Sequence, residues 1–338
     1  MTTKSRTRLE DIAAMAGVSV ATASRALNDS PAVAHATKLA IWRLAREHEY
    51  PFKAHMPAGP IGAQATIVVV TPQHGARGLQ NSFLLELLAG IMDAARDRGC
   101  DVLMSYVAAS NLNELQVLMS TNRADGVIFL GQSSLHKEFN LLAEKEARFV
   151  VWGAELPNQT YCSIGSDNFG GGRLATNHLI RLGRRRIVFL GDVDTPEPAQ
   201  RQRGHIDALQ AHGLPVDPEL LTPCHFDVEA AEAAVGALLD RNVPFDGVVA
   251  ASDQLALGAI RTLQLAGVRV PEDVAVVGYD NLPFARLARP ALTTVAQDVG
   301  KAGRLLVSKL LTARQGSEIR SERLPTELIV RESCGALA

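Results

Sequence analysis

Residues 9–28 read LEDIAAMAGVSVATASRALN, and this stretch decides how the amino-terminal part of the chain folds. Its apolar residues recur at helical spacing on both sides of Gly17, which indicates two short helices joined by a tight turn. Gly17 lies where such a turn needs a positive φ, a conformation that glycine adopts at little cost. Ser19 is a favourable N-cap for the second helix. The stretch therefore predicts a helix over 9–15, a glycine turn, and a second helix that begins after Ser19.

Each of the two predicted helices has one side by which it can pack against the other. These inward-facing positions are Leu9, Ile12, Ala13 and Met15 on the first helix, and Val18, Ala23, Ala26 and Leu27 on the second. The small side chains among them allow a close helix crossing. This arrangement is typical of the helix-turn-helix motif, whose second helix enters the major groove of DNA. The alternative is an ordinary helical hairpin, which the joint presence of turn glycine, cap and small residues disfavours.

The exposed side of the second predicted helix carries side chains suited to duplex DNA. Arg25 offers a fork of donors that can bond guanine, and Val20 and Ala21 can contact thymine methyl groups. Short hydroxyl side chains suited to phosphate oxygens complete this face, namely Ser19, Thr22 and Ser24. The sequence therefore predicts a DNA-reading surface here.

The first fifty-odd residues differ in charge and texture from the rest of the chain. They hold eight Lys and Arg and five Asp and Glu, whereas the whole chain has a net charge of -2. Such an asymmetry favours a local nucleic-acid-facing head over a uniformly basic protein. A third helical pattern with Ile41, Leu44 and Ala45 completes the head over 1–50. The segment 51–65 is rich in Pro and Gly and is typical of a linker.

Beyond the linker, short apolar runs alternate with helical patterns. The runs are 66–70, 101–107, 126–131, 148–153, 185–192, 247–252 and 274–280. Strands that are apolar on both faces belong to covered parallel sheets, and strand–helix alternation implies right-handed βαβ units. The chain of 338 residues is long enough for two such lobes. Ligands of these folds bind outside the carboxyl ends of the strands, so a cleft between the lobes is the expected binding site.

Several other classes of protein are disfavoured by what the sequence lacks. No secretory signal and no long apolar run is visible, and the four cysteines form no CxxC pair or disulfide framework. We therefore expect a cytoplasmic protein with reduced thiols. The glycine-rich stretch at 168–173 lacks GxGxxG spacing, and no P-loop, HExxH or GxSxG motif occurs. We expect neither an enzyme nor a bound cofactor or metal.

The stretch LEDIAAMAGVSVATASRALNDSPAV, residues 9–33, resembles the amino-terminal signature of the LacI/GalR family of transcriptional regulators. The resemblance continues through GSDNFGGGRLATNHLIRLGRRRIVFLGD (165–192), SDQLALGAIRTLQLAGVRVPEDVAVVGYDN (252–281), PALTTVAQD (290–298) and LPTELIVRES (324–333). It implies an all-α helix-turn-helix headpiece joined to an α/β sensor of the type I periplasmic-binding-protein-like fold, with two doubly wound parallel-sheet lobes. Lobe 1 is expected over 66–163 and 292–324, and lobe 2 over 164–291 and 325–335.

The resemblance also implies a homodimer, or a dimer of dimers, that represses transcription by binding near-palindromic operator DNA. It assigns base contacts to Val20, Ala21 and Arg25. It assigns phosphate contacts to Ser19, Thr22, Ser24, Asn28 and Thr37. Family members usually have a hinge helix with an Ala-Arg-x-Leu pattern after the head, but here Pro57 stands at the usual Arg and Gly59 at the usual Leu. Because proline in a helix interior costs about 3 kcal/mol, we expect no such hinge helix, with Met56 and Ile61 as candidate replacements for the wedge.

The effector implied by the resemblance is a small molecule, with a mono- or disaccharide favoured and nucleobases or other polar molecules left open. A sugar site needs carboxylates and Arg for hydroxyl groups and an aromatic face for the ring carbons. The resemblance places such residues at Phe83, Arg201, Phe226, Ser252 and Asp280, while Trp152 is our own candidate for stacking. Asp167 and Asp253 also follow strands and are further candidates, with helix capping as their alternative role. The alternative role of Phe83 and Phe226 is packing in the core.

Two other classes of protein share some of these sequence features. A periplasmic sugar-binding protein would share the sensor fold, but it needs a signal peptide and has no head. A nicotinamide-dependent enzyme would need the phosphate-binding glycine spacing that the stretch at 168–173 does not have. A turnover assay with candidate sugars and cofactors discriminates the enzyme from a regulator.

Overall fold

The computed structural model describes residues 8–27, 30, 33–48, 50, 65–71, 81–105, 109–120, 124–132 and 135–336. These residues form two compact units divided after Gln64, which we call the head and the sensor. Asn28 and the predicted linker segment 51–64 lie outside the described residues. The expectation that Pro57 and Gly59 abolish a hinge helix therefore stays a prediction.

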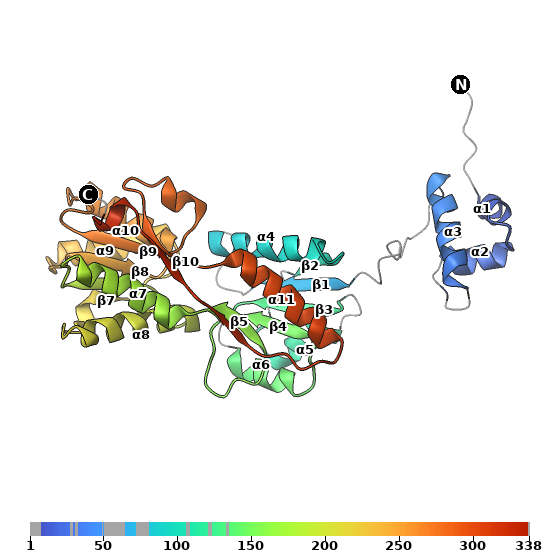
Figure 1. Cartoon of the computed structure of the whole chain (residues 1–338), viewed down its shortest axis with the longest axis horizontal. Helices are drawn as coiled ribbons and strands as arrows, with labels where there is room; N and C mark the ends of the chain where they lie inside the picture. The colour runs from blue at the N-terminus through green and yellow to red at the C-terminus, as the bar shows by residue number, and fades with distance from the viewer. Residues whose placement is uncertain are drawn as a thin grey trace, which may run out of the picture. The chain divides into compact units, whose positions relative to one another are not determined.

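The head consists of three helices, α1 (Leu9–Met15), α2 (Val20–Leu27) and α3 (His35–Glu47) (Figure 1). Gly17 has φ +67° in the turn between α1 and α2, and Ser19 Oγ accepts a hydrogen bond from the Thr22 amide at 3.1 Å. The predicted turn and cap are thus both present. Ile12, Ala26 and Ile41 are fully buried in the small core. Met15, which we expected to face inward, is 42% exposed because it ends α1 just before the chain turns away.

The sensor contains two six-stranded sheets. The first sheet has the order β11-β5-β4-β3-β1-β2 and is parallel throughout. Its strands are β1 (Thr66–Val70), β2 (Asp101–Ser105), β3 (Gly126–Leu130), β4 (Phe149–Trp152), β5 (Ser163–Ser166) and β11 (Glu322–Leu324). This sheet belongs to lobe 1.

The second sheet has the order β12-β10-β9-β8-β6-β7, and only β12 runs antiparallel to its neighbour. Its strands are β6 (Ile187–Leu190), β7 (Leu221–Thr222), β8 (Gly247–Ala250), β9 (Ala275–Asp280), β10 (Thr293–Ala296) and β12 (Glu327–Ile329). This sheet belongs to lobe 2. Its central strands β6, β8 and β9 are buried along their whole length, as their continuous apolar runs predict.

Helices cover both faces of each sheet, which makes each lobe a three-layer sandwich (Figure 1). In lobe 1, α4 (Ser82–Arg96) and α11 (Val299–Arg314) pack together on one face, and α5 (Leu112–Ser120) and α6 (His136–Ala143) on the other. In lobe 2, α7 (Asn168–Arg181) packs on α8 (Pro196–Ala211), and α9 (Val228–Asp240) packs on α10 (Asp253–Leu265). Short 3-10 turns occur at Pro218–Leu220, Pro283–Arg286 and Glu332–Cys334.

The chain crosses between the lobes three times, after β5, after β10 and between β11 and β12. The sheet pairing places residues 164–166 with lobe 1 and 293–296 with lobe 2, whereas our sequence analysis assigned them to the opposite lobes. The reason is that β5 reads SIGS and β10 reads TTVA. Such short, partly polar strands do not reveal from their pattern which of two sheets they join. The boundary between β11 and β12 agrees with the expected one at 324/325.

No described helix is long and apolar enough to cross a lipid bilayer. The four cysteines are free thiols, and Cys162, Cys224 and Cys334 are buried.

Candidate functional site

The exposed side of α2 is the candidate DNA-reading surface of the head. Ala23, Ala26 and Leu27 are buried against the other helices, so the opposite side of α2 faces outward. The predicted residues on that side are either exposed (Ser19, Val20, Ala21, Arg25) or half-buried (Thr22, Ser24). The structure thus brings all six onto one short face. It combines hydroxyl groups, methyl groups and one guanidinium, which suits contacts with phosphates and base edges.

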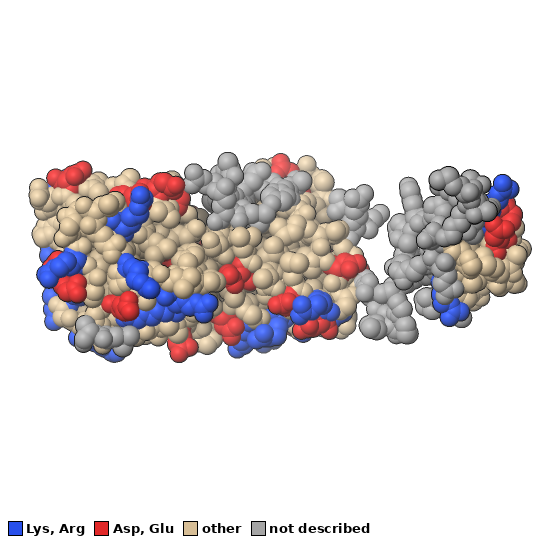
Figure 2. Space-filling model, turned by 90° about the horizontal axis from the view of Figure 1, so that it is seen from above, with Lys and Arg blue, Asp and Glu red and all other residues tan. Residues whose placement is uncertain are grey.

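Two further predicted DNA contacts lie elsewhere. Thr37 is half-buried in the first turn of α3, and Asn28 lies outside the described residues. The sensor, by contrast, mixes basic and acidic side chains on the face that Figure 2 shows, without one large basic field. Two arginines of the Arg184–Arg186 run bond backbone carbonyl groups of the sensor itself. Arg184 Nη2 donates to Pro271 O and Arg186 Nε to Pro244 O, both at 2.6 Å.

The candidate effector site in the sensor is built around Arg201 on α8. Its side chain is buried, with Nε donating to Asn168 Oδ1 at 2.8 Å and Nη1 to Ala251 O at 2.5 Å. The guanidinium lies over the Tyr279 ring, 3.7 Å from its centroid, and Nη1 is 3.9 Å from Asp280 Oδ1. These contacts place the predicted Arg201 and Asp280 together at the end of β9.

Glycines in two helices make this arrangement possible. A Cβ at Gly172 would lie 2.0 Å from Arg201 O, and a Cβ at Gly204 would lie 2.0 Å from Phe169 O. Backbone atoms cannot yield to such contacts, so only glycine lets α7 and α8 approach this closely. The close crossing brings Asn168, at the start of α7, within hydrogen-bonding distance of Arg201.

Asp280 has an unusual backbone and an unusual environment. It has φ 107°, and Asn281 after it has φ 57°, values that non-glycine residues adopt mainly where surrounding contacts enforce them. Gln297 Nε2 donates to Asp280 Oδ1 at 2.6 Å. Burial raises the pKa of Asp280 to about 7, against the opposing effects of Arg201 and Gln297. Burial and the nearby Asp280 charge likewise raise the pKa of Asp253 to about 8.

The predicted aromatic face lies in lobe 1. Phe83, near the start of α4, and Trp152, at the end of β4, have ring centroids 5.8 Å apart. Both are buried in an apolar cluster that also includes Leu282, two residues after Asp280. The two rings are thus part of the apolar core of lobe 1, and their stacking on a ligand stays a prediction.

Other predicted residues have different surroundings. Ser252 is buried and caps α10, since its Oγ accepts from the Leu255 amide at 3.3 Å. Asp253 accepts from Thr294 Oγ1 and from the Leu282 amide, in keeping with a structural role. Phe226 is half-buried against the apolar core of lobe 2, whereas Arg201 and Asp280 belong to α8 and β9.

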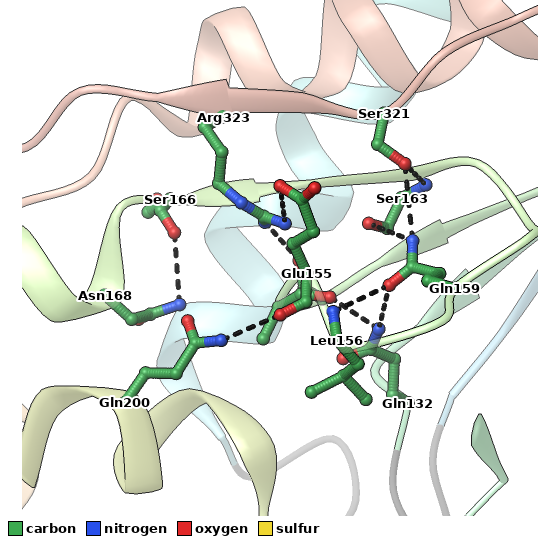
Figure 3. Close-up of polar contacts among 12 residues, drawn as sticks. Gln132, Glu155, Leu156, Gln159, Ser163, Ser166, Asn168, Gln200, Ser321 and Arg323 are labelled. Atoms are coloured by element: carbon green, nitrogen blue, oxygen red, sulfur yellow. Dashed lines mark hydrogen bonds and ion pairs between the residues drawn. The ribbon is translucent and has the colours of Figure 1, made fainter. Parts of the chain in front are cut away.

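Sequence reasoning missed the side chains that hold Arg201 and Asp280 in place, namely Asn168, Tyr279 and Gln297. Each comes from a different segment, and the sequence shows only that two of them flank recognisable caps, Asp167 and Asp298. It also missed the contacts of the loop after β4, one with lobe 2 and one within lobe 1 (Figure 3). Gln200 Nε2 on α8 donates to Glu155 O at 2.9 Å, and Arg323 Nη2 on β11 bonds Glu155 Oε2 at 3.0 Å.

Next to these contacts the sensor has a cavity of about 480 Å³. The loop after β4 lines it from lobe 1, through Glu155, Leu156 and Pro157. The β6–α8 connection and the start of α8 line it from lobe 2. Gln200 lines the cavity and precedes the buried Arg201 on the same helix.

The comparisons with known proteins agree over both units. Residues 8–51 match the model of bacterial regulatory proteins of the lacI family, and residues 176–334 match that of a periplasmic binding protein-like domain. The HTH-type transcriptional regulator CelR of Thermobifida fusca is 34% identical over 98% of this chain and 100% of its own length. The HTH-type transcriptional repressor CytR of Escherichia coli K12 is 32% identical over 97% of this chain and 96% of its own.

Solved structures give the same result. A structure described as a transcriptional regulator CelR–cellobiose complex is 32% identical, with a TM-score of 0.70, and covers 97% of this chain and 100% of its own. The lac repressor dimer bound to operator and the anti-inducer ONPF shares the fold, with a TM-score of 0.79 at 24% identity over 97% of this chain and 99% of its own. Since relatives above 30% identity match end to end, this chain belongs to the LacI family of DNA-binding transcriptional regulators.

Proposed function

We propose that this protein is a sequence-specific repressor in the cytoplasm whose affinity for operator DNA is controlled by a neutral sugar. The observation that carries the sugar assignment is the buried pair of Arg201 and Asp280, held side by side at the carboxyl end of β9. A guanidinium and a carboxylate together supply donors and acceptors for adjacent hydroxyl groups. We assign the site no catalytic step and no cofactor, and a turnover assay with candidate sugars tests that assignment.

The sugar class has support from a relative and from the local chemistry. One relative at 32% identity was solved with cellobiose. In this chain, Phe83 and Trp152 supply an aromatic face from lobe 1, while Arg201 and Asp280 supply polar contacts from lobe 2. A ligand between the lobes would favour one degree of closure over others and so change the population of the DNA-binding state.

Reading of the operator is assigned to the exposed face of α2. In this proposal Arg25 bonds a guanine, Val20 and Ala21 contact thymine methyl groups, and Ser19 and Thr22 contact phosphates. Ser24, Asn28 and Thr37 are assigned further phosphate contacts. The repressor role is favoured by the relative CytR, which is described as a repressor.

We propose a homodimer, because a single head of this size reads only a half-site. In lobe 1 the packed elements α4 and β2 carry three apolar side chains that are more than 40% exposed, Leu85, Met92 and Leu103. A contiguous patch of exposed apolar side chains is typical of an association surface. Sedimentation of the full chain and of Met92→Glu tests this, and an unchanged dimer in the variant would remove α4 from the interface.

Selection of operators from a pool of random duplexes tests the function directly. The full chain should enrich a near-palindromic sequence, and a neutral sugar should weaken its binding at fixed salt. Arg25→Ala should retain weak binding to any duplex but lose the preference for the enriched sequence. No enrichment over random DNA, with or without sugar, would contradict the proposal.

A further inference from the structure

We propose that the cavity between the loop after β4 and the start of α8 is a second sugar subsite, so that the effector is at least a disaccharide. This inference rests on the proposed function, because it takes the first sugar ring to lie at Arg201 and Asp280. The second ring would then lie against Leu156 and Pro157 from lobe 1 and against Val193 and Gln200 from lobe 2.

The size and position of the cavity support this assignment. Its volume of about 480 Å³ lies within the range of roughly 300–1,000 Å³ that is usual for small-molecule sites. It lies at the carboxyl ends of β4 and β6, the edge of each sheet where ligands of such folds bind. Because both lobes line it, a ring bound there contacts both lobes and can act on their closure.

The cavity adjoins the Arg201 cluster through a short run of residues. Gln200 and Arg201 are neighbours on α8, the first at the cavity and the second in the buried cluster. Asn168, which bonds Arg201 Nε, also donates from Nδ2 to Ser166 O at 3.2 Å (Figure 3). The Ser166 hydroxyl is buried and has no hydrogen-bond partner among the described residues. An unpartnered hydroxyl beside Asn168 is suited to a ligand that extends from the cluster into the cavity.

The lining of the cavity fits a neutral, hydroxylated ring. Leu156, Pro157 and Val193 give an apolar surface for the C–H groups of a sugar. Glu155 and Asp194 give carboxylate acceptors for its hydroxyl groups. Arg203 also lines the cavity, so the lining carries both signs of charge and provides donors as well as acceptors for hydroxyl groups.

The wall from lobe 1 is held in place before any ligand binds. Arg323 fixes the loop by bonding both Glu155 Oε2 and Gly153 O, the latter at 3.2 Å. Gln159 Oε1 accepts from the Leu156 amide at 3.1 Å, and Gln200 holds Glu155 O from the other lobe (Figure 3). A wall fixed in this way loses little conformational entropy when a ligand binds.

Titration calorimetry of the full chain with single sugars and disaccharides tests the subsite. The probes are glucose and galactose, and cellobiose, maltose, trehalose and lactose. Ala199→Phe places a ring in the cavity from α8, and Ala211→Phe is the matched control at the exposed end of the same helix. We expect Ala199→Phe to weaken the best disaccharide by about tenfold or more and to leave the single sugar within about twofold. Ala211→Phe should change neither.

A second variant does not alter the shape of the cavity. Asp194→Asn removes one exposed carboxylate and should weaken the disaccharide several-fold without affecting the single sugar. The inference is overturned if Ala199→Phe leaves disaccharide binding unchanged, or if it weakens single sugar and disaccharide equally. It is also overturned if wild-type chain binds a single sugar as tightly as every disaccharide, an outcome that leaves the proposed function intact. If no sugar binds at all, the sugar assignment itself fails.

Discussion

At the scale of the residue, the buried Asp280 carboxyl group makes the candidate effector site sensitive to pH. It is buried beside Arg201 and Gln297, and its charge contributes to the raised pKa of Asp253. Burial raises its pKa to about 7. The group therefore changes its protonation near neutral pH, and an effector that bonds it must respond to pH.

We expect effector affinity to increase with pH between 6 and 8. An ionised carboxylate accepts stronger hydrogen bonds from sugar hydroxyl groups than a protonated one. For a pKa of about 7, the ionised fraction falls about tenfold from pH 8 to pH 6, and affinity should fall by a similar factor. Calorimetry across this range measures the change, with Asp280→Asn as a control whose weaker binding should vary much less with pH. A flat wild-type profile would show that Asp280 does not bond the effector.

Arg201→Ala should abolish the thermal shift caused by the effector while operator binding stays intact. Arg201 lies in the sensor and bonds Asn168 and the backbone of lobe 2, whereas the DNA-reading face belongs to the head. Thermal-shift and anisotropy assays on the same preparation separate the two effects. Loss of both activities would indicate a folding defect, and an unchanged thermal shift would exclude Arg201 from the site.

At the scale of the element, the crossing of α7 and α8 sets the position of Arg201. The two helices touch at Gly172 and Gly204. A Cβ added at either glycine would lie 2.0 Å from a backbone oxygen of the other helix. Arg201 and Asn168 flank this contact on the two helices. The close packing of α7 and α8 therefore also determines the geometry of the candidate effector site.

Gly204→Ala should destabilise the sensor by roughly 3 kcal/mol, because the added methyl group meets Phe169 O and the crossing must open. Gly236→Ala is the matched control, since it lies in α9 with no atom within 4 Å of an added Cβ. The control should gain up to about 1 kcal/mol from helix propensity. Urea unfolding of both variants gives the two free energies, and equal stabilities would contradict the role assigned to this crossing.

The elements that could be predicted from the sequence are those whose own residues determine them. Gly17, Ser19 and the apolar positions of α2 predict the head, and every apolar run that we identified contains a strand of the sensor. Strands β5 and β10 were assigned to the opposite lobes, because they are short and partly polar and depend on partners far along the chain. Arg201 and Asp280 were expected as site residues from their places after strands and from the family resemblance, whereas Asn168, Tyr279 and Gln297, which contact them, come from separate segments without such a signal.

At the scale of the whole molecule, the two activities reside in separate units. The candidate DNA-reading face belongs to the head, up to Gln64, and the effector cluster belongs to the sensor, from Ala65 onward. Regulation requires that these units be energetically coupled, and such coupling between two binding equilibria is reciprocal. An effector that weakens operator binding by some factor must itself bind more weakly, by that factor, to the operator-bound protein.

We therefore expect two independent measurements on the full chain to give one number. The first is the loss of operator affinity caused by saturating effector, measured by anisotropy, and the second is the loss of effector affinity caused by saturating operator duplex, measured by calorimetry. In a homodimer with two effector sites for one operator, the first factor should equal the product of the two stepwise factors measured for the effector, each on the order of 5–150-fold. With Arg25→Ala the selected duplex should no longer change effector affinity, while effector binding without DNA stays at its wild-type value, because Arg25 belongs to the head. Factors close to one in both measurements would mean that effector and operator binding are not coupled, and the proposed control of the head by the sensor would not hold.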